Sequence, residues 1–344
     1  MKYLGSKLLR TTRLELRPQT MKEQHYLWQL LVSPQINEYY LTVPKKFREK
    51  LKIWEIQKQY YIEEMKHAND QDTFKWSIYL KDTNQCIGRI TCHEAHDEDE
   101  QINDPDIRGV GWFIDPSYQK MGYATEAASK MIDYMFNECE IKEIRTSAAM
   151  KNISSWKIME KLNFIRLSDT LQVQYTYQDE STQNYQYLLT RKMYEYLNQD
   201  IDHPKYLFHG SPKKLSILEP KLAYDSNNNK NNIAKAIFLF PSFLKSTPYA
   251  FKDTIKNLST QLDWNFEIPN NDTYPLMIME NVNISDDITG YVYVFLKNDT
   301  MIKDKNTYQY KYYQKLTPID VIEVKYKDYK KYYKLVSQKT TEKK

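Results

Sequence analysis

Glycine is scarce in this chain, with only seven in 344 residues. Four of the seven, Gly88, Gly109, Gly111 and Gly122, fall within one stretch of the first half. A chain so poor in glycine is expected to use one where the backbone must come close to another group. The stretch around Gly122 is therefore the first place to look for a site.

Cysteine is scarce as well. Cys86, Cys92 and Cys139 all lie in the first half and have no Cys-x-x-Cys spacing. No disulfide framework or zinc site can be read from this pattern, which favours a reducing compartment.

Long apolar runs are missing. No run approaches the roughly 18 residues that a membrane-spanning helix needs. The first 18 residues also lack the apolar core, about 7–15 residues long, of a signal peptide. We therefore expect a soluble, cytoplasmic protein that does not contact a membrane.

Arginine is absent from residues 201–344, which carry 22 lysines and 16 acidic residues, a net charge of +6. The rest of the chain has a net charge of −2, so the whole chain carries only +4. This small excess argues against nucleic-acid binding, and the asymmetry between the halves supports two separate domains.

Strands and helices alternate through the first half. Residues 13–19 alternate apolar and polar side chains, as a half-buried strand does. Residues 74–81 and 85–92 are expected to form two strands joined by a tight turn. A second helix is expected to start near Pro44 and continue past Tyr61. This pattern predicts an α/β fold, a mixed sheet with flanking helices.

The domain boundaries follow from these patterns. We expect a first domain over 1–197, a linker over 198–204, a smaller α+β or mostly β domain over 205–335 and a basic tail over 336–344. The second domain is marked by short strand-like runs.

The segment Gln119–Ala124 has the chemistry of a phosphate site. It follows a strand-like run, Val110–Ile114, and opens a helix-like run from Thr125. A fresh helix N-terminus directs several unpaired N–H groups at one point. Lys120 adds positive charge, and Gly122 lets a phosphate approach without a Cβ.

Several motifs, read together, resemble one family. They are Arg13–Pro18 (RLELRP), Cys86–Ile90 (CIGRI), Val110–Pro116 (VGWFIDP), Gln119–Ala124 (QKMGYA), Asn152–Ser155 (NISS) and Met159–Phe164 (MEKLNF). Their order and spacing resemble the GNAT acetyltransferases, in particular the branch that includes the ribosomal-protein N-terminal alanine and serine acetyltransferases. The resemblance covers about residues 8–195 and implies a splayed central sheet.

The resemblance implies acetyl-CoA as co-substrate and direct attack by a neutral amine in a ternary complex. The expected CoA-binding residues are Trp112, Phe113, Ile114, Gln119, Lys120, Met121, Gly122, Tyr123, Ala124, Thr125 and Asn152. A backbone N–H around Phe113 and Ile114 would hold the oxyanion.

Two catalytic positions depart from the family's pattern. Where many relatives place a tyrosine as acid for the leaving thiolate, this chain has Met159. Ser155 is the substitute that the resemblance suggests, although its hydroxyl could instead cap the helix locally. Where relatives often carry a glutamate that acts as the general base, this chain has Gly109. The nearest substitutes are Asp106, Glu94 and His93.

The acidic stretch His93–Arg108 reads as a loop. His93, His96 and the acids Asp97–Glu100 could bind a metal only if the stretch were helical, and we expect none. Because the family places this loop near the acceptor, the acids could attract a cationic amine: a protein N-terminus, an aminoglycoside or a polyamine.

The second half has one suggestive motif, His209-Gly210-Ser211. It resembles the first NAD-contacting motif of ADP-ribosyltransferase-like folds, and Glu323 matches their catalytic glutamate by position only. The alternative function is therefore a regulatory or bifunctional protein. In it the first domain senses acyl-CoA, and the second binds a partner or uses NAD.

Overall fold

The computed structural model describes residues 1–39, 48–97, 100–101, 104–173, 181–222, 234–257, 264–265, 277–280, 284–304 and 309–336. The chain divides into two compact units, Met1–Tyr194 and Glu195–Lys344. Residues 337–344 of the expected tail lie outside the described residues. No helix in the described ranges is both long and apolar enough to cross a membrane.

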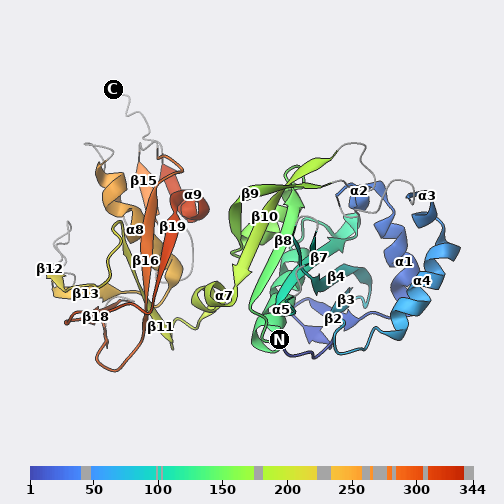
Figure 1. Ribbon diagram of the computed structural model, residues 1–344, viewed down its shortest axis with the longest axis horizontal. Coiled ribbons are helices and arrows are strands. Elements are labelled where there is room, and N and C mark those ends of the chain that lie inside the picture. Colours follow the sequence, from blue (N-terminus) through green and yellow to red (C-terminus); the bar gives the residue numbers. More distant parts are fainter. Residues whose placement is uncertain are drawn as a thin grey trace. The chain divides into compact units, whose positions relative to one another are not determined.

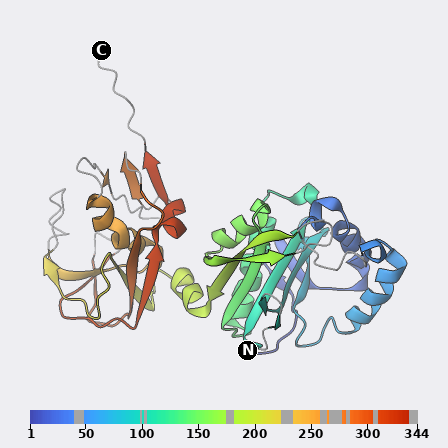
Figure 2. The ribbon, with the colours of Figure 1, turned by 45° about the horizontal axis from the view of Figure 1, so that its top comes forward.

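The first unit is built on an eight-stranded sheet (Figures 1 and 2). In sheet order its strands are β1 (Leu9–Arg10), β2 (Leu14–Pro18), β3 (Lys75–Leu80), β4 (Cys86–Glu94), β7 (Ile107–Ile114), β8 (Glu143–Ala149), β10 (Thr182–Thr190) and β9 (Ile165–Val173). Neighbouring strands are antiparallel except β7 and β8, which are parallel. The predicted mixed sheet with flanking helices is confirmed.

The helices of the first unit cover both faces of the sheet. They are α1 (Met21–Leu31), α2 (Pro34–Asn37), α3 (Arg48–Leu51), α4 (Trp54–Lys66), α5 (Tyr123–Asn137), α6 (Ile153–Lys161) and α7 (Arg191–Asn198), whose last residues belong to the second unit. Leu27 and Leu31 of α1 pack on Phe113 of β7, whereas Tyr134 of α5 packs on Trp76 of β3. The side chains of Phe113 and Trp76 point to opposite faces of the sheet, because side chains alternate along each strand. Helices α1 and α5 therefore lie on opposite faces.

Local sequence explains where the helices begin and end. Thr20 and Glu23 form a capping box at the start of α1, which satisfies amides that the helix leaves unpaired. The expected helix start near Pro44 lies outside the described residues. The expected continuous helix past Tyr61 is wrong, because α3 and α4 are separate and Ile53 between them is extended. Two short strands, β5 (His96–Asp97) and β6 (Glu100–Gln101), also pair within the stretch expected to be a loop.

Glu126 ties the first turn of α5 to the start of β2. Its carboxylate accepts hydrogen bonds from the Thr11 hydroxyl at 2.6 Å, the Arg13 amide at 2.9 Å and the Arg13 Nε at 2.6 Å. Burial alone would raise the pKa of Glu126, but the hydrogen bonds from Thr11 and Arg13 outweigh burial and hold the pKa below its ordinary value. The charged form of Glu126 therefore stabilises the junction.

The second unit contains several small sheets and one long helix, α8 (Phe243–Asn257). One sheet is formed by β11 (Tyr206–Ser211), β16 (Thr289–Leu296) and β19 (Asp320–Lys325), and a second by β12 (Lys221–Leu222), β13 (Lys235–Leu239), β18 (Tyr310–Tyr312) and β17 (Ile302–Lys303). A third is formed by β14 (Trp264–Asn265), β15 (Met277–Glu280) and β20 (Tyr333–Val336), and the short helix α9 (Tyr326–Tyr329) follows β19. The expected sheet-rich second half is confirmed.

Helix α8 lies directly against the backbone of β11 and β16. A Cβ added to Gly210 would lie 2.7 Å from the Ala250 nitrogen, and closer still to the Ser246 carbonyl oxygen. A Cβ on Gly290 would meet the Ala250 backbone in the same way. Close packing against α8 therefore explains the glycine in His209-Gly210-Ser211.

The Glu126 junction predicts a pH-dependent loss of stability in Glu126→Gln. We expect the free energy of unfolding to fall by about 1 kcal/mol at pH 7, a modest cost because Arg13 is 45% exposed. The pKa of Glu126 is lower in the folded than in the unfolded protein, so its charge stabilises the fold fully at pH values above the unfolded pKa. The difference in unfolding free energy between wild type and Glu126→Gln should therefore persist down to about pH 4.5 and shrink below it.

Urea unfolding followed by tryptophan fluorescence measures this difference, since five of the six tryptophans lie in the first unit. Glu63→Gln is the matched control, because Glu63 is 70% exposed and pairs with Lys66 on the surface of α4. It should change stability little at any pH. A Glu126→Gln cost that is equal at pH 7 and pH 3.5 would contradict the account.

Gly210→Ala should destabilise the second unit by about 1–3 kcal/mol, because the new Cβ must displace the backbone of α8. Hydrogen exchange should speed up in peptides from β11 and α8 and stay unchanged in the first unit. Ser211→Ala, on the other face of β11, is the control and should leave exchange rates close to wild type. Unchanged exchange in Gly210→Ala would rule out this packing.

Candidate active site

Strands β7 and β8 separate after a short paired segment. Their parallel register holds only for Ile107 with Glu143 and Arg108 with Ile144. Two residues further along each strand, the Thr146 hydroxyl donates to the Val110 carbonyl at 3.1 Å, so a side-chain hydrogen bond replaces the backbone ladder. Beyond this point the two strands leave an open edge on β7.

The register decides which backbone groups of β7 face this opening. The Val110 carbonyl points toward β8, whereas the Gly111 carbonyl accepts from the Thr91 hydroxyl of β4 at 3.4 Å. Because backbone groups alternate along a strand, the amides of Trp112 and Ile114 face the opening and that of Phe113 faces β4. Of the two residues around which an oxyanion-binding amide was expected, only Ile114 turns its amide toward the opening. The Trp112 amide faces the opening as well.

A short 3₁₀ turn, Pro116–Tyr118, connects β7 to the glycine segment. Asp115 caps this turn through the Ser117 amide at 2.8 Å, and the Tyr26 hydroxyl donates to the same carboxylate. The Gln119 side chain reaches back to the Ile114 carbonyl at 3.0 Å. Gln119 therefore fixes the segment to the end of β7. This hydrogen bond gives a structural explanation for a glutamine at this position.

Helix α5 begins with unpaired amides. Gly122 is its N-cap, with φ +83°, and offers no side chain to cap the helix. The first hydrogen bond within the helix runs from the Glu126 amide to the Gly122 carbonyl at 3.0 Å. Tyr123, Ala124 and Thr125 thus keep amides with no partner among the described residues, and the helix dipole makes this end attractive to anions.

The backbone around Gly122 takes left-handed conformations. Lys120 has φ +63°, and Gly122 has φ +83°. The nearest atom to a Cβ on Gly122 is an Arg13 Nη2 at 3.4 Å, so crowding is slight. The positive φ by itself therefore explains the glycine.

Arg13 braces this segment from the start of β2, a role that the sequence did not predict. Its Nη1 donates to the Met121 carbonyl at 3.0 Å, and its guanidinium lies 4.5 Å from the centre of the Tyr123 ring. Arg13 is the first residue of the RLELRP motif, and this motif was the only sign in the sequence that Arg13 has a role. The charge of Arg13 is paired with Glu126, and exposed Lys120 adds a further positive charge beside the unpaired amides.

Helix α6 begins where β8 ends. Asn152 is its N-cap, and its Oδ1 accepts from the Ser155 amide at 3.2 Å. The cap is thus Asn152 and not Ser155, whose hydroxyl has no hydrogen-bond partner within the described part of the chain. Ser155 is half-buried in the first turn of α6, and Met159 is buried one turn further on.

Two expected base candidates lie away from the opening. Asp106 precedes β7 and forms ion pairs with the Met1 amino group and, at 2.8 Å, with Lys142. These partners, Lys142 first, hold the pKa of Asp106 below its ordinary value. Glu94 ends β4 opposite Arg108, on the face of the sheet that α5 covers.

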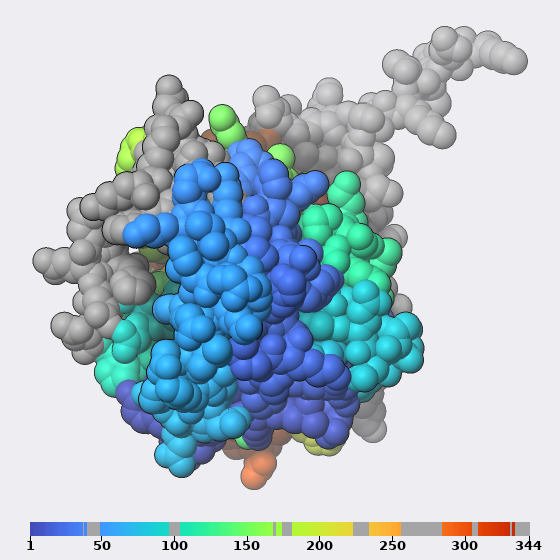
Figure 3. Space-filling model, turned by 90° about the vertical axis from the view of Figure 1, so that its right-hand side faces the viewer, coloured from blue at the N-terminus to red at the C-terminus, as the bar shows by residue number. Residues whose placement is uncertain are grey.

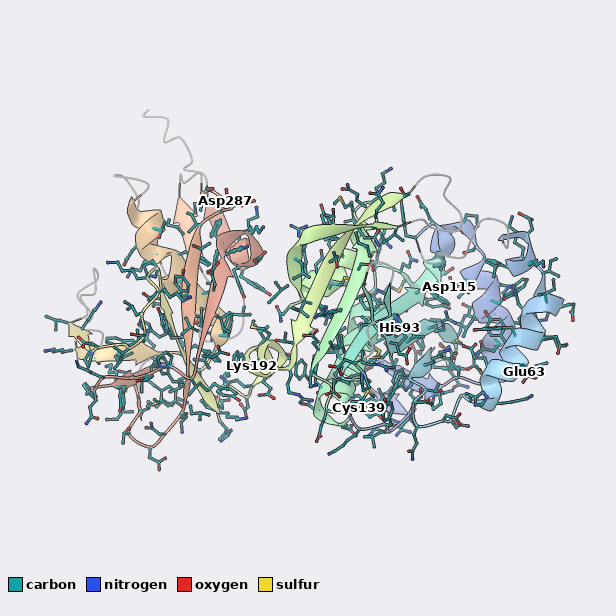
Figure 4. The ribbon with its side chains drawn as sticks, in the orientation of Figure 1. Glu63, His93, Asp115, Cys139, Lys192 and Asp287 are labelled. Atoms are coloured by element: carbon teal, nitrogen blue, oxygen red, sulfur yellow. The ribbon has the colours of Figure 1, made fainter. Side chains whose placement is uncertain are left out.

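His93 lies on the other face, opposite Gly109. Figure 4 labels His93 within the first unit. Gly109, Gly111 and Phe113 alternate along β7 on the face covered by α1, whose outer surface Figure 3 shows. Glu98 and Asp99 of the acidic stretch lie outside the described residues. Within the described ranges, no three His, Cys, Asp or Glu side chains are grouped to hold a metal.

The second unit arranges the His209 motif in cross-strand rows. Ser211 pairs with Tyr291, which pairs with Glu323, and these three share one face with His209. The His209 ring is within 2.8 Å of the Phe238 carbonyl through Nδ1, and burial lowers the pKa of His209. His209 thus makes a structural hydrogen bond between β11 and β13.

Known proteins resemble the first unit. The chain is 30% identical over 92 residues to the uncharacterized N-acetyltransferase YnaD of Bacillus subtilis, covering 27% of this chain and 50% of that protein. It is 24% identical over 160 residues to the uncharacterized N-acetyltransferase p20 of Bacillus licheniformis, covering 45% and 81%. The chain spans about half the length of YnaD and of a second Bacillus subtilis relative, YjdG.

Among solved structures, the ribosomal-protein-S5-alanine acetyltransferase from Vibrio fischeri is 14% identical, with a TM-score of 0.43. It covers 55% of this chain and 99% of its own. The sequence model of the acetyltransferase (GNAT) domain matches residues 13–165, which include β2 through α6 and the whole opening between β7 and β8. The first unit therefore has the GNAT fold, and residues 13–165 match the GNAT acetyltransferase domain.

Proposed function

We propose that this protein transfers an acetyl group from acetyl-CoA to a primary amine. The observation that carries the proposal is the set of unpaired amides at the start of α5, next to the open edge of β7. The match of residues 13–165 to the acetyltransferase (GNAT) domain supports the same reaction.

The donor would bind in two parts. Its pyrophosphate would accept hydrogen bonds from the amides of Tyr123, Ala124 and Thr125, with Lys120 and Arg13 adding positive charge. Its pantetheine arm would extend along β7 and pair with the backbone of Trp112 and Ile114, as an added strand would. Asn152 lies at the end of β8, across the opening, where it would contact the same arm.

The chemical step would be a direct transfer. The amine nitrogen attacks the thioester carbonyl, and the developing oxyanion accepts a hydrogen bond from a β7 amide that faces the opening. The C–S bond then breaks, the amine loses one proton, and CoA leaves as the thiol after gaining one. Ser155 is the candidate donor of that proton, because its hydroxyl is not used by the cap.

The acceptor class is proposed from charge. The acids of Asp97–Glu100 follow β4 and would attract a cationic amine toward the sheet. A protein N-terminus, an aminoglycoside and a polyamine all fit this description. Acetyl transfer screened across these three classes tests the proposal and identifies the acceptor.

The alternative, in which the first domain senses acyl-CoA and the second binds a partner or uses NAD, is less well supported. The family match lies wholly within the first unit and favours acetyl transfer. The position of Gly210 against α8 gives the His209 motif a structural explanation.

Gly122→Val should weaken acetyl-CoA binding at least about tenfold, a change of about 1.4 kcal/mol. A β-branched residue cannot hold φ +83° without strain, so the amides of α5 should turn away from the phosphate. Isothermal titration calorimetry measures the Kd. Asn84→Val places similar strain in the β3–β4 turn, at φ +57°, and should leave the Kd unchanged. Equal affinities in wild type and Gly122→Val would contradict the proposed site.

Ser155→Ala should lower kcat by about 100-fold if its hydroxyl protonates the leaving thiolate. The Kd for acetyl-CoA should stay close to wild type, because the Asn152 cap remains. Steady-state release of CoA, followed with a thiol reagent, measures kcat. The control is Ser154→Ala, which removes an exposed hydroxyl from the neighbouring position. A kcat equal in both variants would remove Ser155 from the mechanism.

A further inference from the structure

A pocket of about 310 Å³ lies between helix α4 and the start of β3. It is lined by Gln19, which directly follows β2, by Thr73 and Lys75, and by the last two turns of α4 with the residues after them. Figure 4 labels Glu63, which belongs to this part of α4. None of the lining residues belongs to β7, β8, α5 or α6, so the pocket is separate from the opening beside β7.

Gln19 is a polar residue of this pocket that lacks a partner. It is only 3% exposed, and within the described ranges neither Nε2 nor Oε1 of its side chain has a hydrogen-bond partner. Buried amides in folded proteins nearly always form hydrogen bonds, because an unmade bond leaves the cost of removing the group from water uncompensated. An unpaired amide in the wall of a pocket therefore points to a group that enters the pocket.

The backbone explains why Gln19 lines this pocket. The pairing of β2 with β3 ends at Pro18 and Trp76, directly before Gln19. Lys75, next to Trp76, has its side chain on the opposite face of the sheet, where it pairs with Glu64 of α4. No hydrogen bond fixes the Gln19 amide, and the terminal torsion of a glutamine has broad minima. Rotation about this torsion can therefore turn either edge of the amide toward the pocket.

The charged groups that line the pocket are already paired. Three pairs account for them: Lys75 with Glu64, Glu63 with Lys66, and His67 with Asp70. A charged ligand would have to compete with one of these pairs for its partner. A neutral ligand leaves all three pairs intact, so the lining favours a neutral molecule.

The Gln19 amide defines the polar group of such a ligand. Its Nε2 donates and its Oε1 accepts, so the complementary group carries one acceptor and one donor side by side. A carboxamide has this arrangement, and two carboxamides can pair through two hydrogen bonds. A carboxylate only accepts and an ammonium group only donates, so each would leave one atom of Gln19 unpaired.

The pocket also offers an apolar surface. Tyr60 is 63% exposed although its ring lines the pocket, whereas Ala68 is buried in the wall. Met65 lies between them in sequence, and its sulfur accepts from the Gln24 Nε2 at 3.6 Å. An aromatic ring and a thioether are good surfaces for the hydrocarbon part of a small ligand.

We infer that this pocket binds a small neutral molecule that carries a carboxamide, and that Gln19 is the residue that recognises it. The amide of the ligand would pair with the amide of Gln19, and its hydrocarbon part would pack against Met65 and Tyr60. This site does not depend on the proposed acetyl transfer, because it shares no residue with the proposed acetyl-CoA site.

Benzamide is a suitable probe, since it joins a primary carboxamide to a flat apolar ring. An NMR titration with the full chain measures its Kd. Benzoate replaces the amide nitrogen with a second oxygen, and N,N-dimethylbenzamide lacks the N–H donors. We expect benzamide to bind at least about tenfold more tightly than either compound, because each of them leaves part of the Gln19 amide unpaired.

Gln19→Met keeps the length of the side chain and removes both polar atoms. Benzamide should bind this variant at least about tenfold more weakly than it binds wild type. The melting temperature of the ligand-free protein should rise, because the buried unpaired amide is gone. Gln29→Met removes an exposed amide from α1 and should change neither quantity. The Kd for acetyl-CoA should stay the same in both variants.

The comparison of the three compounds uses wild type alone, so it stands independently of how Gln19→Met folds. The inference is overturned if benzamide fails to bind, or if it binds no more tightly than benzoate. Equal affinity of benzamide for wild type and Gln19→Met would overturn it as well. Each of these results leaves the proposed acetyl transfer standing.

Discussion

The separation of β7 from β8 is the constraint on which the rest of the first unit depends. Two parallel strands that paired along their whole length would satisfy every backbone group between them. Here the ladder stops after Arg108 and Ile144, and the Thr146 hydroxyl makes the next link. The remaining edge of β7 therefore stays available to a ligand that can pair with a strand. Backbone groups along this edge need hydrogen-bond partners, which water or a bound ligand can supply.

The start of α5 extends this edge into a second kind of site. A glycine with positive φ begins the helix without a side-chain cap, and Arg13 and Glu126 hold the turn against β2. The strand edge suits an extended amide-bearing arm, and the helix start suits a phosphate. Acetyl-CoA contains both groups in one molecule, and this is the physical reason to propose it as the donor.

The sequence predicted much of this arrangement. Apolar periodicity and the position of Gly122 located α5, which spans Tyr123–Asn137, and the strand before it. What the sequence could not predict depends on register and on packing between distant elements. Which of Trp112, Phe113 and Ile114 turns its amide toward the opening follows from the pairing of β7 with β4. Likewise, His93 meets Gly109 only because the two strands pair in that register.

A crystal structure of the complex with CoA is the most direct test of the proposed donor site. We expect the pyrophosphate oxygens within about 3 Å of the amide nitrogens of Tyr123, Ala124 and Thr125, and the pantetheine paired with β7 at Trp112 and Ile114. Pyrophosphate bound away from the start of α5, or a β7 edge left unpaired in the complex, would contradict it.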